Sequence, residues 1–316
     1  MKKIVYITGC LGFIGIHLTR ACLLRGWYVI GVDKITYASN YHLLTEFTSN
    51  NHFTFINKDI NDLDRLLDCD YIINTAAESH VDNSIISSDL FMHSNVMGVH
   101  HLLELIRQQP RNKSPIFLHF STDEVYGDVE NGAHDEFDIL RPSNPYSASK
   151  AAADMLILAW ARTYSIRYII VRPTNNYGIG QYVEKLIPKS VKYLKLGKKI
   201  DLHDHGRPVR TWLHANDTAQ AILQLIDSGV HNSIFNISGN LELPNYQVIQ
   251  KILSFYFDKN MDDCWEQYTM DSQRQGQDVR YSIDDSKLKL LGWQPQADFD
   301  TELKLIVEYY RNNFLW

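Results

Sequence analysis

Two groups of residues have the types and spacing needed for acid–base chemistry. Ser121-Thr122-Asp123-Glu124-Val125-Tyr126-Gly127 follows the apolar run 115–120, which is typical of a buried strand. In an open α/β sheet, ligands bind beyond the carboxyl ends of the strands. The second group, Tyr146 and Lys150, is spaced by one helical turn. Together these side chains can transfer protons, although Asp123 and Glu124 alone could equally cap a helix or face solvent.

A glycine-rich turn near the N-terminus predicts a phosphate-binding site. The apolar run Ile4–Thr8 is followed at once by Gly9, Gly12 and Gly15, and apolar residues at helical spacing continue from Ile16 to Arg25. In this strand–turn–helix context, glycines let backbone N–H groups approach a pyrophosphate at the helix N-terminus. A plain glycine-rich turn is the weaker alternative.

An acidic residue at the end of the second predicted strand favours NAD over NADP. Residues 28–32 form the strand and Asp33 ends it. A carboxylate there accepts hydrogen bonds from the adenosine ribose and repels a 2′-phosphate. The neighbouring Lys34 weakens this preference without reversing it.

The next two predicted strands end in residues suited to the rest of a dinucleotide. After strand 53–56, Asp59 and Ile60 can flank an adenine ring, with a helix N-cap as the alternative for Asp59. Strand 71–74 leads into small residues that let the dinucleotide cross the sheet edge, Thr75-Ala76-Ala77. His80, a little further on, either contacts the substrate or begins a helix.

Two long helices are predicted, one with its apolar residues on one side and the other apolar on more than one face. Residues 90–109 and 146–164 are both long, and the second is apolar nearly all round. Such a helix needs a second packing partner besides its own sheet. We expect the two helices to form a four-helix interface across a two-fold axis in a homodimer, the alternative being burial within one subunit.

The alternation of strands and helices predicts an α/β fold, a Rossmann-type doubly wound parallel sheet with a smaller α/β C-terminal substrate domain. We assign residues 1–177 to the dinucleotide-binding domain and residues 178–316 mainly to the substrate domain. Residues 207–238, with a predicted helix at 215–226 and a strand at 234–237, are expected to return to the larger domain.

Composition narrows the possible partners. The 316 residues carry a formal net charge of -6, so nucleic-acid binding is not expected. No apolar run is long enough to span a membrane, and glycines interrupt anything like a signal peptide. Four scattered cysteines indicate a reducing compartment, hence the cytoplasm. No metal site is expected: His203-Asp204-His205 is better explained as a turn, because three consecutive ligands have poor geometry.

These motifs resemble those of the extended short-chain dehydrogenase/reductases over essentially the whole chain, and most closely the nucleoside-diphosphate-glucose 4,6-dehydratases. Besides the glycine turn and the Tyr146/Lys150 pair, the matching segments are 33–38, 76–82, 121–127, 175–178 and 184–188. The adjacent Asp123 and Glu124 distinguish these dehydratases from 4-epimerases. The chain departs from the family pattern at Cys10, at Thr211 and in segment 273–278, which leaves the base and sugar open.

The resemblance implies NAD-dependent conversion of a hexose nucleotide to its 4-keto-6-deoxy form. Tyr146, its pKa lowered by Lys150, would deprotonate O4; Glu124 would take the C5 proton, and Asp123 would protonate the departing C6 hydroxyl. Alternatives are a dehydratase or 4-epimerase for another sugar nucleotide and, remotely, a non-catalytic NAD sensor. The implied catalytic residues are Thr122, Asp123, Glu124, Tyr146 and Lys150.

The resemblance and the strand ends together give two sets of binding residues. The cofactor set is Gly9, Gly12, Phe13, Ile14, Gly15, Asp33, Lys34, Thr36, Asp59, Ile60, Thr75, Ala76, Ala77, Ser94, Tyr146, Lys150 and Asn176. The substrate set is Ser79, His80, Thr122, Asn175, Lys185, Leu186, His203, Arg210, Asn236, Arg274 and Gln277.

Overall fold

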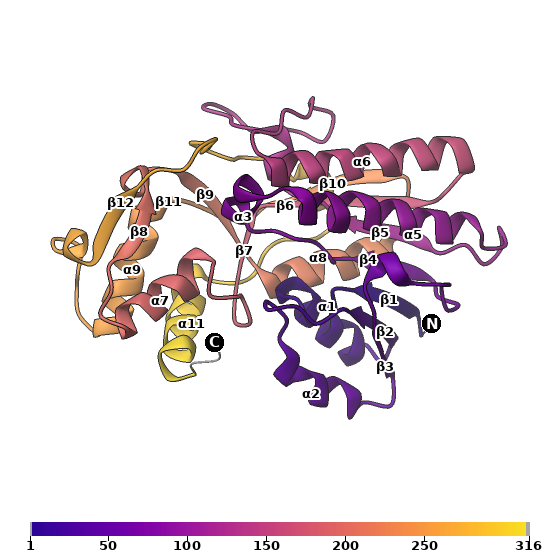
Figure 1. Ribbon diagram of the computed structural model, residues 1–316, viewed down its shortest axis with the longest axis horizontal. Coiled ribbons are helices and arrows are strands. Elements are labelled where there is room, and N and C mark those ends of the chain that lie inside the picture. The colour runs from indigo at the N-terminus through magenta and orange to yellow at the C-terminus, as the bar shows by residue number, and fades with distance from the viewer. Residues whose placement is uncertain (1, 314–316) are drawn as a thin grey trace.

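A seven-stranded parallel sheet forms the centre of the protein in the computed structural model, which describes residues 2–313 (Figure 1). The strands lie in the order β10-β6-β5-β4-β1-β2-β3. Their bounds are β1 Ile4–Thr8, β2 Tyr28–Asp33, β3 Phe53–Asn57, β4 Tyr71–Asn74, β5 Ile116–Phe120, β6 Tyr168–Pro173 and β10 Ser233–Ile237. This is the predicted doubly wound sheet. The strand order reverses between β1 and β4, which opens a crevice at the carboxyl ends of the strands.

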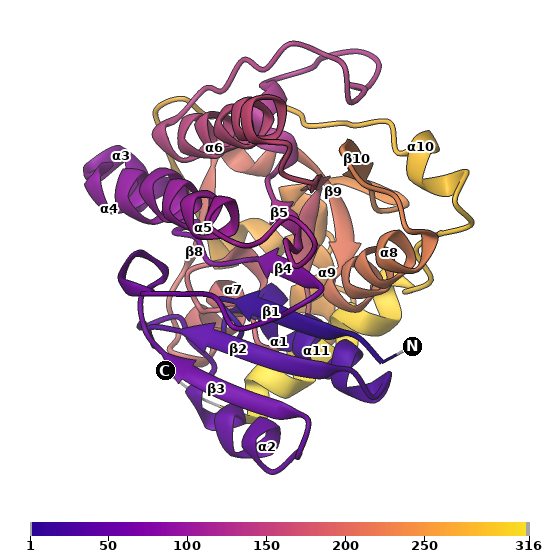
Figure 2. The same cartoon turned by 90° about the vertical axis from the view of Figure 1, so that its right-hand side faces the viewer.

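Helices cover both faces of this sheet (Figure 2). One face packs against α1 (Phe13–Leu24), α2 (Leu44–Thr48) and α8 (Ala215–Ser228), and the other against α5 (Gly98–Arg107) and α6 (Pro145–Tyr164). The predicted helix 90–109 consists of α4 (Asp89–Phe91), a π-helical turn (Met92–Met97) and α5; α3 (Val81–Ile86) precedes it. Because both faces are covered, the strands are apolar almost throughout.

A second core lies beyond the carboxyl ends of the large sheet. Two small sheets belong to it, β11-β9-β7 and β12-β8. Their strands are β7 Asn175–Tyr177, β8 Ile200–His203, β9 Val209–His214, β11 Leu241–Pro244 and β12 Thr269–Ser272. Helices α7 (Leu186–Lys195), α9 (Asn245–Phe257) and α11 (Phe299–Asn312) pack beside them around buried Trp212, Ile252 and Leu303.

Segments of the C-terminal half are divided between the two cores. Of residues 207–238, α8 and β10 pack in the large sheet, whereas β9 pairs with β7 and β11. Short α10 (Ser286–Lys289) also packs on the large core through Leu288. The domain boundary near residue 177 stays a prediction. Within residues 2–313, no helix is both long and apolar enough to cross a membrane.

Candidate active site

A long cleft crosses the carboxyl ends of the large sheet, with an empty volume of about 1300 Å³ including its open mouth. The predicted cofactor residues line it, with the exception of Asn176. The Asn176 amide donates to Thr174 O at 3.0 Å and accepts from the Thr218 hydroxyl at 2.5 Å. Asn176 therefore organises the loop after β6 and is not part of the cleft wall.

The glycine turn between β1 and α1 has no room for side chains. A Cβ on Gly15 would lie 2.0 Å from Gly9 O, and Gly9 itself has a φ of +67°. Gly12 is the N-cap of α1 and supplies no side-chain hydrogen bond to the first helical turn. Since N–H groups at a helix N-terminus bind phosphate oxygens, these residues fit the pyrophosphate of a dinucleotide.

Gly15→Ala is expected to abolish NAD binding at micromolar concentrations, because the added methyl group must displace the Gly9 carbonyl and reshape the phosphate turn. Gly12→Ala, whose Cβ would lie 3.1 Å from the same oxygen, should have a smaller effect. Isothermal titration of the two variants with NAD, alongside thermal unfolding, measures this. Equal affinities for wild type and Gly15→Ala would contradict the assignment of the turn.

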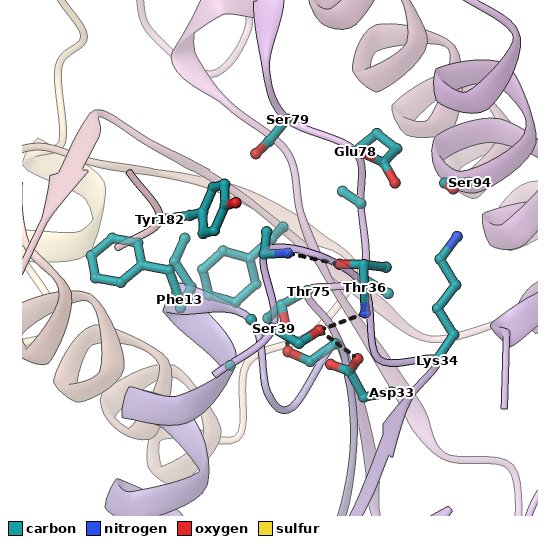
Figure 3. Close-up of a pocket in the computed structure, with 18 of the residues that line it drawn as sticks. Phe13, Asp33, Lys34, Thr36, Ser39, Thr75, Glu78, Ser79, Ser94 and Tyr182 are labelled. Atoms are coloured by element: carbon teal, nitrogen blue, oxygen red, sulfur yellow. Dashed lines mark hydrogen bonds between the residues drawn. The ribbon is translucent and has the colours of Figure 1, made fainter. Parts of the chain in front are cut away.

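Asp33, the residue predicted to bind the adenosine ribose, lines the cleft at the end of β2. Its carboxylate accepts hydrogen bonds from Leu11 N at 3.0 Å, Ile35 N at 2.8 Å and the Ser39 hydroxyl at 3.1 Å. Figure 3 shows Asp33 and Ser39 connected in this way, with Lys34 on the other side of the loop from Phe13 and Tyr182. A carboxylate has about four lone-pair sites, so Asp33 retains capacity for a ribose hydroxyl.

Lys34 and Asp59 form an ion pair beside Asp33. The Lys34 ammonium lies 3.2 Å from Asp59 Oδ2, while Asp59 Oδ1 accepts a hydrogen bond from Asn61 N at 2.9 Å. Asp59 is therefore the N-cap of the turn Ile60–Asp62 and also lines the cleft. The N-cap interpretation of Asp59 is confirmed, its contact with an adenine ring stays a prediction, and the Lys34 charge has a partner.

The proposed catalytic residues come from two elements that begin at the same edge of the sheet. Thr122, Asp123 and Glu124 follow β5, and Tyr146 and Lys150 lie in the first turns of α6. A capping box holds the start of α6, in which the Asn144 side chain accepts from Ser147 N at 2.9 Å. Tyr146 and Lys150 are buried against this first cleft, named the cofactor cleft after the predicted residues that line it. Glu124 lines a second, adjoining cleft, named the substrate cleft and described below.

The two carboxyl groups have different electrostatic surroundings. Burial, reinforced by the charge of Glu124, raises the pKa of Asp123 to about 7. Burial also raises the pKa of Glu124, but the positive charges of Arg210 and Lys185 oppose that shift. Among the described residues, Asp123 Oδ2 has no hydrogen-bond partner although it is buried. Asp123 is therefore the carboxyl group suited to donate a proton, and Glu124, which faces the two cations, is the one suited to accept a proton.

The sequence analysis expects a lowered pKa for Tyr146, and this expectation is wrong for the arrangement of charges in the structure. Burial and the charges of Glu124 and Asp123 raise the pKa of Tyr146 above its usual range, and a hydrogen bond with Thr122 only opposes this. Burial lowers the pKa of Lys150 to about 8, with Asp154 opposing that shift. The loss of solvent and the two carboxylates therefore decide the direction of the Tyr146 shift.

A second cleft adjoins the first, and Ser79, Glu184 and Lys185 line both. It is polar and has an empty volume of about 970 Å³. Most of the predicted substrate residues line it: Ser79, His80, Asn175, Lys185, Leu186, His203, Arg210, Arg274 and Gln277. His203 lies in the cleft wall and accepts or donates a hydrogen bond with the Ser272 hydroxyl at 3.0 Å.

Two predicted substrate residues do not line this cleft. The Asn236 amide is fully buried, accepting from the Tyr126 hydroxyl at 2.9 Å and donating to His134 O and Asp284 O. It holds the loops after β5 and β12 together. Thr122 is also outside the cleft wall, bonded instead to Tyr146 and Asp123.

Several cleft residues were not predicted. Tyr281 stacks on the Arg210 guanidinium, whose carbon lies 4.3 Å from the ring centre, and Asp82 accepts from Arg274 at 2.5 Å. Tyr182 and Glu184 reach the cofactor cleft from the loop before α7. Asp82 and Glu184 lie within the matching segments 76–82 and 184–188. Asn144, which hydrogen-bonds Glu124, had a local signal: an N-cap residue directly before a proline at the start of a helix.

The sheet, glycine turn and Tyr/Lys pair place the chain among the extended short-chain dehydrogenase/reductases. The family model described as GDP-mannose 4,6 dehydratase matches residues 6–306. The chain belongs to this sugar-nucleotide 4,6-dehydratase family.

Relatives and solved structures agree with that membership. The dTDP-glucose 4,6-dehydratase of Streptomyces niveus is 37% identical, over 99% of this chain and 94% of the relative. The structure of the dTDP-glucose 4,6-dehydratase DesIV from Streptomyces venezuelae, solved with NAD bound, superimposes with a TM-score of 0.90 at 36% identity, covering 98% of this chain and 97% of that one. The UDP-glucuronic acid 4-epimerase of Bacillus cereus has a TM-score of 0.88 at 23% identity, covers 98% and 99%, and shares the fold.

Proposed function

We propose that this protein is an NAD-dependent hydro-lyase that converts a nucleoside-diphosphate hexose, dTDP-glucose in the first instance, to its 4-keto-6-deoxy derivative. The observation that carries the proposal is the pair Asp123 and Glu124 beside Tyr146. Glu124 lines the substrate cleft near the positive charges of Arg210 and Lys185, whereas Asp123 is buried outside the cleft wall. Oxidation at C4 would need only the tyrosine as a base. An elimination needs a further base and an acid, and two carboxyl groups in different surroundings can supply both.

Bound NAD supplies a reversible hydride acceptor and, in its oxidised form, a positive charge. The residues of the chain move the protons. Tyr146, hydrogen-bonded to Thr122, takes the proton of the sugar O4 hydroxyl as its phenolate, which the positive charge of bound oxidised NAD would favour against the burial that raises its pKa. The resulting 4-keto group acidifies the C5 proton, which Glu124 removes. Asp123 donates its proton to the departing C6 hydroxyl, which leaves as water. Glu124 then returns its proton to C5 while the hydride taken from C4 would be returned to C6, and this gives the 4-keto-6-deoxy product.

A panel of sugar nucleotides tests the proposed substrate. The protein is incubated with dTDP-, UDP-, GDP- and CDP-glucose and with UDP-N-acetylglucosamine, and products are identified by mass spectrometry and proton NMR. We expect loss of one water and a 4-keto-6-deoxy sugar from dTDP-glucose. A C4 epimer of unchanged mass would identify an epimerase, and no product from any member would refute the dehydratase proposal.

The proposal includes a homodimer built on α5 and α6. These helices lie side by side in both views (Figures 1 and 2) and pack on one another. Large apolar side chains are exposed on them and on the elements leading into them: Ile86, Leu90, Met92, Met97, Met155 and Tyr164. A second copy of the same surface would cover them.

A cytoplasmic location is also part of the proposal, supported by four cysteines that form no disulfide.

Met155→Glu is expected to convert the dimer to monomers, since it places a charge at the centre of the exposed α6 surface. Sedimentation velocity at micromolar concentration measures the mass directly. Leu24→Glu, at an equally apolar exposed position on α1 across the sheet, is the control and should remain dimeric. A wild-type protein that sediments as a monomer would refute the interface.

A further inference from the structure

A row of three buried polar residues crosses the face of the large sheet that α5 and α6 cover. Thr8, Asn74 and His119 are paired in register on the adjacent strands β1, β4 and β5, which lie next to one another in Figure 2. The flanking positions of the row are apolar, Val32 on β2 and Ile170 on β6. Polar groups so deeply buried are costly unless hydrogen bonds satisfy them.

The row is connected from end to end. The Thr8 hydroxyl lies 2.6 Å from Asn74 Oδ1, and Asn74 Nδ2 lies 3.0 Å from His119 Nδ1. His119 Nε2 lies 3.5 Å from Lys150 Nζ, at the outer limit of a hydrogen bond. The chain of contacts therefore begins beside the glycine turn, directly before Gly9, and ends on the lysine of the catalytic group.

This row can be satisfied with its hydrogen bonds running in either direction. In one arrangement Thr8 donates to Asn74, Asn74 donates to His119 Nδ1, and the imidazole Nε2–H donates to a neutral Lys150 amine. In the other, a Lys150 ammonium donates to Nε2, Nδ1–H donates to Asn74 Oδ1 after the amide has turned, and the amide donates to Thr8. A neutral imidazole serves in both, because it has one donor and one acceptor nitrogen.

We propose that His119 is a positioning residue whose neutral imidazole, oriented by Asn74 and Thr8, favours the protonated form of Lys150. The contact from an ammonium to a neutral nitrogen is charge-assisted and stronger than its reverse. Burial lowers the pKa of His119 well below its usual range, which keeps the ring neutral. Only the activity measurement in the test below rests on the proposed function.

The other ionisable groups around Lys150 are accounted for. Asp154, one turn further along α6, opposes the lowering of the Lys150 pKa by burial, and Arg172 from β6 is ion-paired with Asp154 at 2.9 Å. Tyr146 precedes Lys150 by one turn, and Asp123 and Glu124 act on Tyr146. His119 is the group on β5 that contacts Lys150 within the described residues.

Two substitutions should lower the pKa of Lys150. His119→Phe keeps the flat ring that stacks on Phe117 but removes the acceptor for the ammonium. Asn74→Leu does not touch Lys150; it leaves Nδ1–H without an acceptor and so disfavours the tautomer that accepts from the ammonium. We expect a downward shift of about one pH unit for His119→Phe, a tenfold change in the ratio of ammonium to amine, and a smaller shift in the same direction for Asn74→Leu.

Side-chain NMR of the full-length protein labelled with ¹³C-lysine, titrated with pH, measures Lys150 directly; a Lys150→Met variant assigns its signal. The alkaline limb of the kcat/KM profile for dehydration should move with it. His119→Gln, whose carbonyl can accept from the ammonium, should restore the wild-type titration. Ile170→Val removes a methyl group beside His119 in the same row and should lower thermal stability without moving the titration.

An unchanged Lys150 titration in both His119→Phe and Asn74→Leu would overturn the proposal, as would a shift in Ile170→Val equal to theirs. Because Asn74→Leu lies away from the lysine, the test survives if His119→Phe fails to fold. If no sugar nucleotide is dehydrated, the proposed function fails while the NMR titration still decides the role of His119.

Discussion

Glu124→Gln is expected to stop dehydration while leaving oxidation at C4 intact. Glutamine has the same shape but cannot take the C5 proton, and removing a general base lowers the rate by about 10²–10⁴-fold. Because Tyr146 and Thr122 are unchanged, mixing the variant with substrate should produce a stable absorbance of reduced cofactor. The wild type, which completes the cycle, should not accumulate it.

Stopped-flow absorbance, with mass spectrometry of the sugar nucleotide, follows both steps. Glu130→Gln is the matched control, since Glu130 is an exposed carboxylate in the loop that follows, and it should leave both steps unchanged. Formation of the 4-keto-6-deoxy product by Glu124→Gln at a near-native rate would show that another group removes the C5 proton.

The largest effect on stability is expected from Arg172→Met, which breaks a buried ion pair behind the active site. The Arg172 Nε donates to Asp154 Oδ2 at 3.0 Å, and Nη1 donates to the Tyr126 hydroxyl at 2.7 Å. Arg172 and Asp154 are both almost fully buried. Removing the cation leaves a buried carboxylate without a counter-charge, which costs about 3–5 kcal/mol.

Thermal unfolding should register this as a fall of roughly ten degrees. The double variant Arg172→Met/Asp154→Leu should recover part of the loss, because the carboxylate has also gone. Arg207→Met, which breaks the exposed pair with Asp204, serves as the control and should leave the free energy of unfolding nearly unchanged. Equal losses for Arg172→Met and Arg207→Met would show that the buried pair contributes little.

The acid–base roles connect these predictions to the fold. Asp123 can hold a proton near neutral pH because the end of β5 buries it, whereas the C-terminal segments bring to Glu124 the charge of Arg210, which opposes the rise of its pKa. The loop before α7 brings Lys185, whose ammonium donates to Ser79 O at 2.7 Å. The division of labour between two adjacent carboxyl groups thus depends on cations from the other half of the chain.

The sequence by itself determined the parallel sheet and the local motifs. Each large-sheet strand is a short apolar run, and the strands β1 and β4 have the predicted bounds. These strands can be predicted because a parallel sheet is buried on both faces. Each strand is then a continuous apolar run, which is recognisable without reference to distant residues. The glycine turn, Asp33 and the Tyr146/Lys150 spacing are likewise properties of single short segments.

The tertiary structure alone decided everything that depends on segments far apart in sequence. β7, β8, β11 and β12 are too short for their alternation to show, and they form only because they pair across the second core. Asn176 and Asn236 lie outside the cleft walls because their amides are bound by Thr218 and Tyr126, which no local pattern reveals. The pKa of Tyr146 rises because burial, a property of the packed molecule, adds to the nearby carboxylates. The row of Thr8, Asn74 and His119 exists only through strand register, which the sheet sets and no single segment contains.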